Sequence, residues 1–221
     1  MIPQELPSIP GGWTERTFEC GKHQIQLTLP QSPDDMLETE EALAANEQNN
    51  YTPYWSYLWP AAIEMLKVIP TLPIPDGADV LEIGCGIGLV GIAAAVCGHK
   101  VTLSDYAADA VQLAAYNAAR NGIELFSARR IDWTQPPPAD FDVVLACDVL
   151  YEQRDHEPLL QFLEQIIAGG GVAWIGDPGR QRALEFIGLA QARCRVDIFD
   201  ASLNRMTSTP RGLSVLRLSK H

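Results

Sequence analysis

Three glycines alternate in a loop that follows a short apolar run, at Gly84, Gly86 and Gly88. Glycine adopts positive φ angles and has no Cβ, so a backbone with this spacing can pass close to a bound ligand. A helix that begins after the loop would also direct its free N–H groups toward that ligand. Acidic residues stand on either side of the loop, Glu82 before it and Asp105 at the end of the next apolar run. Together these residues predict a site for a nucleoside.

Two nucleoside cofactors fit the glycine loop. Residues 86–91 match the GxGxxG pattern of dinucleotide-binding proteins, and residues 82–88 match the acidic-x-G-x-G-x-G pattern of enzymes that use S-adenosylmethionine (SAM). In dinucleotide sites the first glycine follows the strand closely, but here Gly84 already ends the strand. A carboxylate at Glu82 is also unfavourable near a pyrophosphate and favourable near the ammonium and sulfonium groups of SAM. The loop therefore favours SAM over NAD, and over a purely structural turn, which three alternating glycines would weaken.

The composition indicates one well-packed domain. The chain has 221 residues, enough for one α/β domain with additions and too few for two full domains. Its 16 basic and 28 acidic residues give a formal net charge of -12, which argues against nucleic acid as a substrate, because phosphate contacts need a basic surface. A cationic small molecule or a basic patch on a protein would suit this charge better.

Targeting signals and metal-binding motifs are not evident in the sequence. No apolar run reaches membrane-spanning length, and the first residues have neither a basic start nor an apolar signal core, so we expect a cytoplasmic protein without a membrane partner. The cysteines are widely spaced and form no CxxC pair, so we expect buried thiols, with no disulfide framework and no metal site. They are Cys20, Cys85, Cys97, Cys147 and Cys194.

The elements that must position the loop alternate between β and α from residue 78 onward. Apolar patterns predict strands at residues 80–83, 100–104, 127–131, 141–147 and 172–176, and helices at residues 60–68, 89–97, 107–118 and 159–167. This alternation implies a doubly wound, mostly parallel sheet that binds its ligand at the carboxyl ends of the strands. Residues 195–199 and 213–218 are β-rich with no helical pattern between them, which predicts an antiparallel C-terminal hairpin at the sheet edge. That hairpin favours the seven-stranded, Rossmann-like sheet of methyltransferases over a dinucleotide-binding sheet.

Residues 1–50 are expected to extend a main domain that spans residues 51–221. Residues 17–20 and 24–29 alternate between polar and apolar, which predicts an N-terminal β-hairpin. Residues 34–50 are acidic and rich in alanine, which indicates either a short helix or a mobile lid.

Four further segments, one before the glycine loop and three after it, have an order and spacing that resemble those of a known enzyme family. They are residues 53–60 (PYWSYLWP), Asp132-Trp133, residues 148–151 (DVLY) and residues 177–180 (DPGR). With the glycine loop, they resemble the seven-β-strand SAM-dependent methyltransferases over residues 51–180. More narrowly, the chain is similar to the lysine methyltransferase family 16 group, often labelled nicotinamide N-methyltransferase-like, which includes relatives of the electron-transfer-flavoprotein β-subunit lysine methyltransferase. The resemblance implies SAM as the cofactor and S-adenosylhomocysteine (SAH) as its product.

The resemblance also implies which residues contact the cofactor. Asp105 matches the acidic ligand of the ribose hydroxyls, with a helix N-cap as the alternative. Asp132-Trp133 matches the adenine-binding turn, with a polar turn and a half-buried tryptophan as the alternative. Trp59 matches a tryptophan near the cofactor, although tryptophans in aromatic clusters are often core residues. The expected cofactor contacts are Trp59, Glu82, Gly84, Cys85, Gly86, Gly88, Asp105, Tyr106, Asp132, Trp133 and Cys147.

Asp148 and Tyr151 are the expected catalytic residues. They follow the strand at residues 141–147, so they should emerge at the carboxyl edge of the sheet, and they match the family's Asp-x-x-Tyr motif. A helix cap followed by a core tyrosine is the alternative. We expect Asp148 to bind and orient an ammonium group while Tyr151 desolvates it and favours proton loss. Residues 177–180 are either a simple turn or a substrate loop.

The resemblance implies direct transfer of the SAM methyl group to a nitrogen nucleophile, with an exposed lysine of a partner protein as the acceptor. A small aromatic or heterocyclic amine is the alternative, because the aromatic residues 51–59 could stack on a ring. An NAD-binding or non-catalytic nucleoside-binding module is a more remote alternative, since Asp148 and Tyr151 would then have no role.

Overall fold

The computed structural model describes residues 5–49, 51–137 and 141–221. Its main-sheet strands are β3 Asp79–Ile83, β4 Lys100–Asp105, β5 Phe126–Arg130, β6 Val143–Cys147, β7 Val172–Asp177, β8 Arg195–Phe199, β9 Arg205–Met206 and β10 Ser214–Ser219. Its helices beside this sheet are α3 Pro60–Val68, α4 Leu89–Val96, α5 Ala108–Arg120, α6 Gln153–Ala168 and α7 Gln181–Gln191. Short 3-10 turns occur at η1 Tyr54–Ser56 and η2 Ile69–Thr71.

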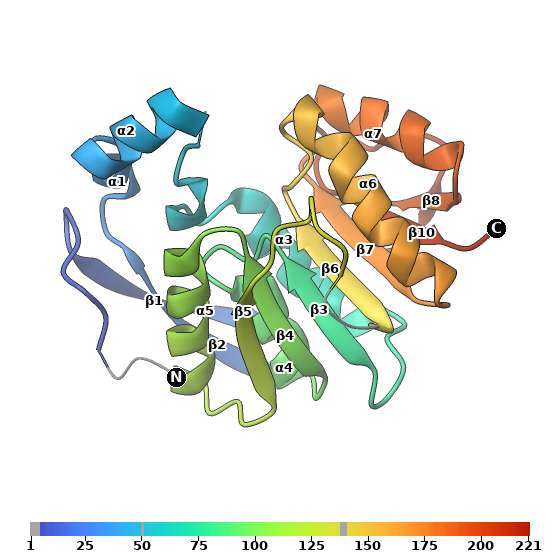
Figure 1. The fold of residues 1–221 in the computed structure, drawn as a ribbon. Helices are drawn as coiled ribbons and strands as arrows, with labels where there is room; N and C mark the ends of the chain where they lie inside the picture. Colours follow the sequence, from blue (N-terminus) through green and yellow to red (C-terminus); the bar gives the residue numbers. More distant parts are fainter. Residues whose placement is uncertain (1–4, 50, 138–140) are drawn as a thin grey trace.

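The strands form one mixed sheet of order β5-β4-β3-β6-β7-β10-β8-β9 (Figure 1). The strands from β5 to β7 are parallel, and β10 is antiparallel to both β7 and β8. The chain runs outward from β3 through β4 to β5 and then returns to β6 on the other side of β3. Ligands bind at such a reversal of strand order, beyond the carboxyl ends of the strands. The predicted doubly wound sheet with an antiparallel C-terminal hairpin is confirmed.

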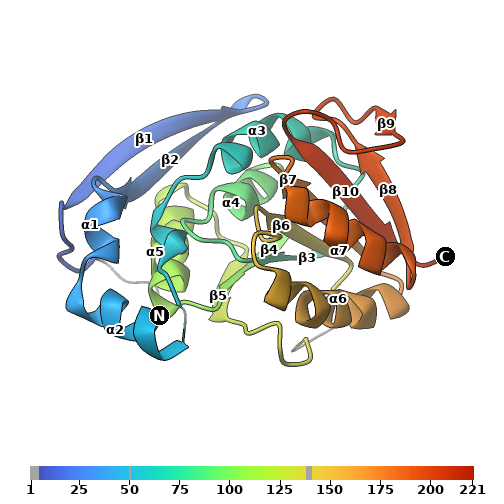
Figure 2. The ribbon, with the colours of Figure 1, turned by 90° about the horizontal axis from the view of Figure 1, so that it is seen from above.

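Helices cover both faces of the sheet (Figure 2): α3, α4 and α5 lie on one face, and α6 and α7 lie on the other. Successive residues of a strand point to opposite faces, so Val143 and Leu145 join the core under α3–α5, and Val144 and Ala146 join the core under α6–α7. Within the described part of the chain, no helix is both long and apolar enough to cross a membrane.

An N-terminal hairpin packs on the face covered by α3–α5, as predicted. It consists of β1 Trp13–Cys20 and β2 His23–Pro30, paired antiparallel. The fully buried Asn117 of α5 accepts a hydrogen bond from the Thr28 N–H at 2.8 Å and donates to the Thr28 carbonyl at 3.0 Å. The side chain of Asn121 makes the same pair of bonds with Gln26, both at 2.8 Å. Asn117 in α5 and Asn121 at its C-cap therefore pair with backbone groups on the outer edge of β2.

Two short helices, α1 Pro33–Leu37 and α2 Glu40–Asn49, follow the hairpin where the sequence predicted a helix or a lid. The Tyr57 hydroxyl donates a hydrogen bond to the Asp34 carboxylate and so ties α1 to the aromatic segment. The Asn46 amide on α2 donates to the Thr52 hydroxyl at 3.0 Å. Residue 50 of the predicted segment lies outside the described residues.

The end of the chain differs from the prediction in three ways. Helix α7 occupies a stretch for which the sequence predicted no element, although its buried Ala183, Phe186, Ile187 and Ala190 have helical spacing. Helix α6 begins at Gln153, before the predicted residue 159, and holds Pro158 inside it, where proline normally disfavours a helix. The two-residue strand β9 adds an eighth strand at the edge, and β10 lies between β7 and β8.

Candidate active site

A cavity of about 750 Å³ opens beyond the carboxyl ends of β3, β4 and β6. This volume is typical of a site for a small molecule or cofactor. The cavity is lined by the glycine loop, the ends of these strands, the turn after β5, and the aromatic segment 51–59. Twelve predicted site residues line it: Trp59, Glu82, Gly84, Cys85, Gly86, Asp105, Tyr106, Asp132, Trp133, Cys147, Asp148 and Tyr151.

The three loop glycines all have positive φ angles, but they do not share one role. A Cβ on Gly84 would lie 2.8 Å from Cγ1 of Val149, and a Cβ on Gly86 would lie 3.3 Å from the Trp55 carbonyl oxygen. Gly88 lies outside the cavity lining formed by the described residues, at the N-cap of α4. A Cβ there would lie 3.0 Å from the Ala114 Cβ. Gly84 and Gly86 thus shape the cavity, whereas Gly88 lets α4 approach α5.

Asp105 holds the glycine loop and the start of α5 together. Its Oδ2 accepts a hydrogen bond from the Gly86 N–H at 2.9 Å, and its Oδ1 accepts one from the Ala107 N–H at 2.9 Å. Burial raises the pKa of Asp105, and these backbone N–H groups oppose that rise. Each carboxylate oxygen retains a lone pair for ligand hydroxyls. Ala107, not Asp105, is the N-cap of α5, so Asp105 forms a turn just before the helix and remains available to a ribose.

Glu82 lines the cavity, and its Oε2 faces Gly91 of α4. The residue is 2% exposed, and its Oε2 has no hydrogen-bond partner among the residues that the structure describes. Burial raises the pKa of Glu82, although a hydrogen bond with the Gly91 backbone opposes the rise. Buried polar atoms are normally paired, so this oxygen is a cost of placing a carboxyl group here. A carboxylate in the cavity lining suits a cationic group such as the ammonium of SAM.

The turn after β5 carries Asp132 and Trp133. The Asp132 Oδ1 accepts hydrogen bonds from the Thr134 N–H at 2.9 Å and from its hydroxyl at 2.7 Å. Trp133 is half-buried and packs against the core under α6–α7. On the other side of the opening, the exposed Tyr106 ring lies 6.1 Å from the Tyr51 ring, centroid to centroid. These residues line a part of the cavity that has both aromatic faces and a carboxylate.

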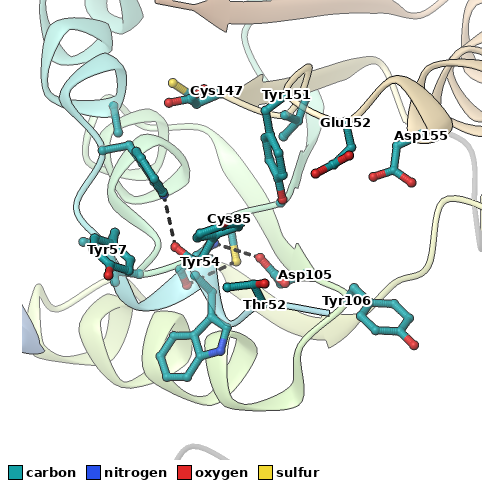
Figure 3. Close-up of a pocket in the computed structure, with 18 of the residues that line it drawn as sticks. Thr52, Tyr54, Tyr57, Cys85, Asp105, Tyr106, Cys147, Tyr151, Glu152 and Asp155 are labelled. Atoms are coloured by element: carbon teal, nitrogen blue, oxygen red, sulfur yellow. Dashed lines mark hydrogen bonds between the residues drawn. The ribbon is translucent and has the colours of Figure 1, made fainter. Parts of the chain in front are cut away.

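Aromatic side chains line the opposite part of the cavity. The Tyr54 ring meets the rings of Tyr151 and Trp59 edge to face, at centroid distances of 5.8 Å and 5.9 Å. The Trp59 indole N–H donates to the Tyr54 carbonyl at 3.1 Å. Burial raises the pKa of Tyr151 to about 12, so its hydroxyl stays protonated at neutral pH. In Figure 3, Tyr151 lies beside Glu152 and across the cavity from Asp105.

Asp148 is paired within the protein, which the sequence did not predict. The residue has a positive φ of 57°, and its side chain is 4% exposed. Its Oδ1 accepts a hydrogen bond from Nε of Arg180 at 2.6 Å. The Asp177 carboxylate accepts bonds from the N–H groups of Gly179 and Arg180, both at 2.8 Å, and so forms the turn that brings Arg180 to Asp148. The expected free carboxylate therefore already has a cationic partner.

Several lining residues carried no signal in the sequence. Glu152 and Asp155 lie next to Tyr151 at the start of α6, and burial raises the pKa of Asp155 (Figure 3). They were missed because the predicted helix began later. Asn46 reaches the lining from α2, whereas Tyr54 belongs to the aromatic segment that the sequence had singled out.

The sequence model of a family described as lysine methyltransferase matches residues 39–187, which is more than half of the chain. The chain belongs to this lysine methyltransferase family. The histone-arginine methyltransferase METTL23 of Rattus norvegicus is 32% identical over 121 residues, which cover 48% of this chain and 51% of the relative. The electron transfer flavoprotein beta subunit lysine methyltransferase of Danio rerio is 28% identical over 131 residues, which cover 58% of this chain and 51% of the relative. The chain thus spans about half the length of these curated relatives.

The fold is shared with solved methyltransferase structures. The TehB-like SAM-dependent methyltransferase from Corynebacterium glutamicum has a TM-score of 0.59 and 19% identity, over 87% of this chain and 100% of that chain. Family membership and fold confirm the resemblance inferred from the glycine loop and the later motifs. The two curated relatives differ by name in the residue they methylate, arginine or lysine, so likeness alone does not assign the acceptor.

Proposed function

We propose that the protein is a SAM-dependent methyltransferase that methylates a nitrogen of a partner protein, with a lysine side chain as the acceptor. One observation carries the proposal: a single cavity combines the Glu82 carboxylate and the glycine loop with Asp148 and Tyr151. Glu82 and the glycine loop suit a cationic nucleoside, whereas Asp148 and Tyr151 suit an amine. A cavity with both is what methyl transfer to nitrogen requires.

The described residues fit the ammonium group, the ribose and the adenine of SAM. Glu82 would bind the ammonium group, Asp105 the ribose hydroxyls, and Asp132 with Trp133 the adenine. When bound, SAM supplies a methyl group that its sulfonium already activates for in-line displacement, with SAH as the product. The protein therefore needs no covalent intermediate, and its main task is to position the nucleophile.

Three residues form what we call the acceptor wall: Trp59, Asp148 and Tyr151. The two aromatic rings would cover the aliphatic part of a lysine side chain and keep water away from its nitrogen. A lysine amine has an ordinary pKa of about 10.4, so its neutral form at pH 7 costs about 4 to 5 kcal/mol. The acceptor wall must therefore favour the neutral amine, which forms when the ammonium ion gives a proton to water before transfer.

Acidic residues at the cavity suit a basic partner segment. Glu152, Asp155 and Asp132 all line the opening, and the whole chain has a formal net charge of -12. Opposite charge on the partner would speed their association and orient the encounter.

A small aromatic amine is the second candidate, and the aromatic cluster favours it. The rings of Tyr57 and Trp59 lie 5.3 Å apart, centroid to centroid, with 31° between their planes. Such a surface could stack on a heterocycle as well as cover a lysine stem.

Two measurements test the proposed function. Calorimetric titrations with SAM, SAH and NAD should show binding of the first two and none of NAD; tight NAD binding without SAM binding would contradict the proposal. Methyl-labelled SAM is then added with the purified protein to a lysate of the native host. Label in a protein band that yields methyllysine on hydrolysis supports a lysine acceptor. Label in methylarginine or in the small-molecule fraction contradicts it.

A further inference from the structure

Arg180 places a positive charge directly behind the acceptor wall. Its guanidinium carbon lies 5.9 Å from the Trp59 ring centroid and 6.0 Å from the Tyr151 ring centroid, while its Nε bonds to Asp148 at 2.6 Å. All three wall residues line the cavity, but Arg180 is not part of the lining that the described residues form. The guanidinium therefore contacts the wall from outside and leaves the cavity open to an acceptor.

The turn before α7 fixes this charge in position. Asp177 is fully buried, and one of its carboxylate oxygens accepts the N–H groups of both Gly179 and Arg180. One turn further on, the Arg182 guanidinium donates to the Tyr151 carbonyl at 2.8 Å. The segment that carries Arg180 is thus bound both to its own turn and to the wall. These bonds describe a built-in partner of Asp148 rather than a mobile side chain that plugs the cavity.

The charge of Arg180 changes what Asp148 does to an amine. An unpaired carboxylate stabilises an ammonium ion and raises the pKa of the amine, which opposes formation of the nucleophile. A guanidinium stays protonated at any physiological pH, so the paired wall is neutral overall. Nearby positive charge also lowers the pKa of an amine, as it does for activated lysine nucleophiles in other enzymes.

We propose that Arg180 is a positioning residue that neutralises Asp148, so that the acceptor wall takes up an amine in its neutral form rather than as an ammonium ion. This inference rests on the proposed function. The amine first loses a proton to water. Its nitrogen lone pair then forms the bond to the methyl carbon as the carbon–sulfur bond breaks and leaves its electron pair on sulfur.

The charge of the wall can be tested with n-butylammonium, which has the side-chain cation of lysine and requires no identified partner protein. The full chain is saturated with SAH and titrated with n-butylammonium chloride at pH 7, as wild type and as Arg180→Gln, Asp148→Asn and the double variant. The formal charge of the Asp148–Arg180 pair is zero in the wild type, negative in Arg180→Gln, positive in Asp148→Asn, and zero in the double variant. Affinity should rise about tenfold or more in Arg180→Gln, because a charge at this range shifts a pKa by about 1 to 3 units. It should fall in Asp148→Asn and return near the wild-type value in the double variant.

The controls separate charge from structure. Arg180→Lys retains the positive charge and should bind n-butylammonium like the wild type; binding as tight as in Arg180→Gln would contradict the proposal. So would an Arg180→Gln variant that keeps its melting temperature and SAH affinity but binds the probe no more tightly. If Arg180→Gln does not fold, the Asp148→Asn variant provides the test. An affinity of this variant for n-butylammonium equal to or above that of wild type would overturn the inference. Failure of the wild type to bind SAH contradicts the proposed function instead.

Discussion

The Asp105 carboxylate accepts a hydrogen bond from the Gly86 N–H at 2.9 Å, so the predicted ribose ligand also fixes the glycine loop. The Cys85 N–H bonds to the Ser104 carbonyl at the same distance of 2.9 Å, which attaches the loop to the end of β4 a second time. Loop geometry and ribose binding therefore depend on one another. A ligand that bonds to Asp105 meets an acceptor already held in place by two backbone donors.

Asp105→Ala should weaken both SAM affinity and folding. We expect the dissociation constant for SAM to rise about tenfold or more, since charge-assisted hydrogen bonds contribute about 1.5 to 3 kcal/mol each. The unfolding free energy should fall by about 1 to 3 kcal/mol, because the Gly86 N–H loses its acceptor. Calorimetry and denaturant unfolding measure the two effects. Asp109→Ala, at an exposed position in the first turn of α5, is the matched control and should change neither.

Glu82→Gln should stabilise the free protein at neutral pH and weaken its binding of SAM. Burial raises the pKa of Glu82 above its ordinary value of 4.5, so the folded state holds this proton more strongly than the unfolded state does. The stability from that proton is present below the unfolded pKa and is lost as pH rises through the folded pKa. The unfolding free energy of the variant should therefore exceed that of wild type increasingly above pH 4.5.

The same change should remove the pH dependence of SAM binding. A cation beside Glu82 favours its ionised form, so wild-type affinity should increase as pH rises through the raised pKa, while the variant stays flat. Melting curves and calorimetry across this pH range provide the measurement. Glu124→Gln, at an exposed position, is the control. Equal pH dependence in wild type and Glu82→Gln would rule out Glu82 as the ligand of the cation.

Gly91→Ala should damage the site through Glu82. The added Cβ would lie 2.3 Å from Oε2 of Glu82 and 2.3 Å from Cδ2 of Leu103, so at least one of these buried side chains must move. Overpacking of this kind costs about 1 to 3 kcal/mol of unfolding free energy. SAM affinity should fall as well, because a shift of the Glu82 side chain changes a residue that lines the cavity.

Gly188→Ala provides the matched control on α7. The structure places no described heavy atom within 4 Å of a Cβ at Gly188, which lies exposed inside the helix. Alanine there should raise the unfolding free energy by up to about 1 kcal/mol through helix propensity alone. A Gly91→Ala variant as stable as wild type would contradict the packing described around Glu82. A destabilised Gly188→Ala variant would contradict the open space described around Gly188.

The parts of the site that follow strands were predictable from the sequence. Glu82, Asp105 and Cys147 each lie at the end of an apolar run, and parallel strands bring their carboxyl ends to one edge of the sheet. The order of the elements therefore placed these strand ends together, whereas residues such as Trp59 and Asp132-Trp133 were expected at the site from the family resemblance.

The pairing of Asp148 with Arg180 was not predictable in this way. The two residues are 32 positions apart, and their contact depends on a turn whose shape comes from the Asp177 side chain. Helix α7 was missed because four buried positions among exposed ones are a weak signal next to two β-rich runs. Side-chain pairs across loops depend on tertiary geometry, whereas strand ends depend only on element order.

Asn117→Ala should detach the N-terminal hairpin from the glycine loop. Besides its two bonds with the Thr28 backbone, the Asn117 amide donates to the Ile87 carbonyl at 3.0 Å, and Ile87 lines the cavity. Removal of the side chain leaves three backbone groups without partners, so the unfolding free energy should fall by about 3 kcal/mol or more. SAM affinity should fall as well, because the carbonyl lies in the loop that shapes the site. Hydrogen exchange at the Thr28 amide should accelerate before that of the main sheet.

Asn121→Ala separates the effect of the hairpin contact on stability from its effect on SAM affinity. Asn121 makes the same pair of bonds with Gln26 but is only half-buried, and among the described residues it forms no hydrogen bond to the glycine loop. The variant should lose less stability, about 1 to 2 kcal/mol, and keep its SAM affinity. If both asparagine variants lower SAM affinity equally, the hairpin as a whole supports the site. If only Asn117→Ala does so, the bond to Ile87 transmits the effect, which is the outcome that the geometry predicts.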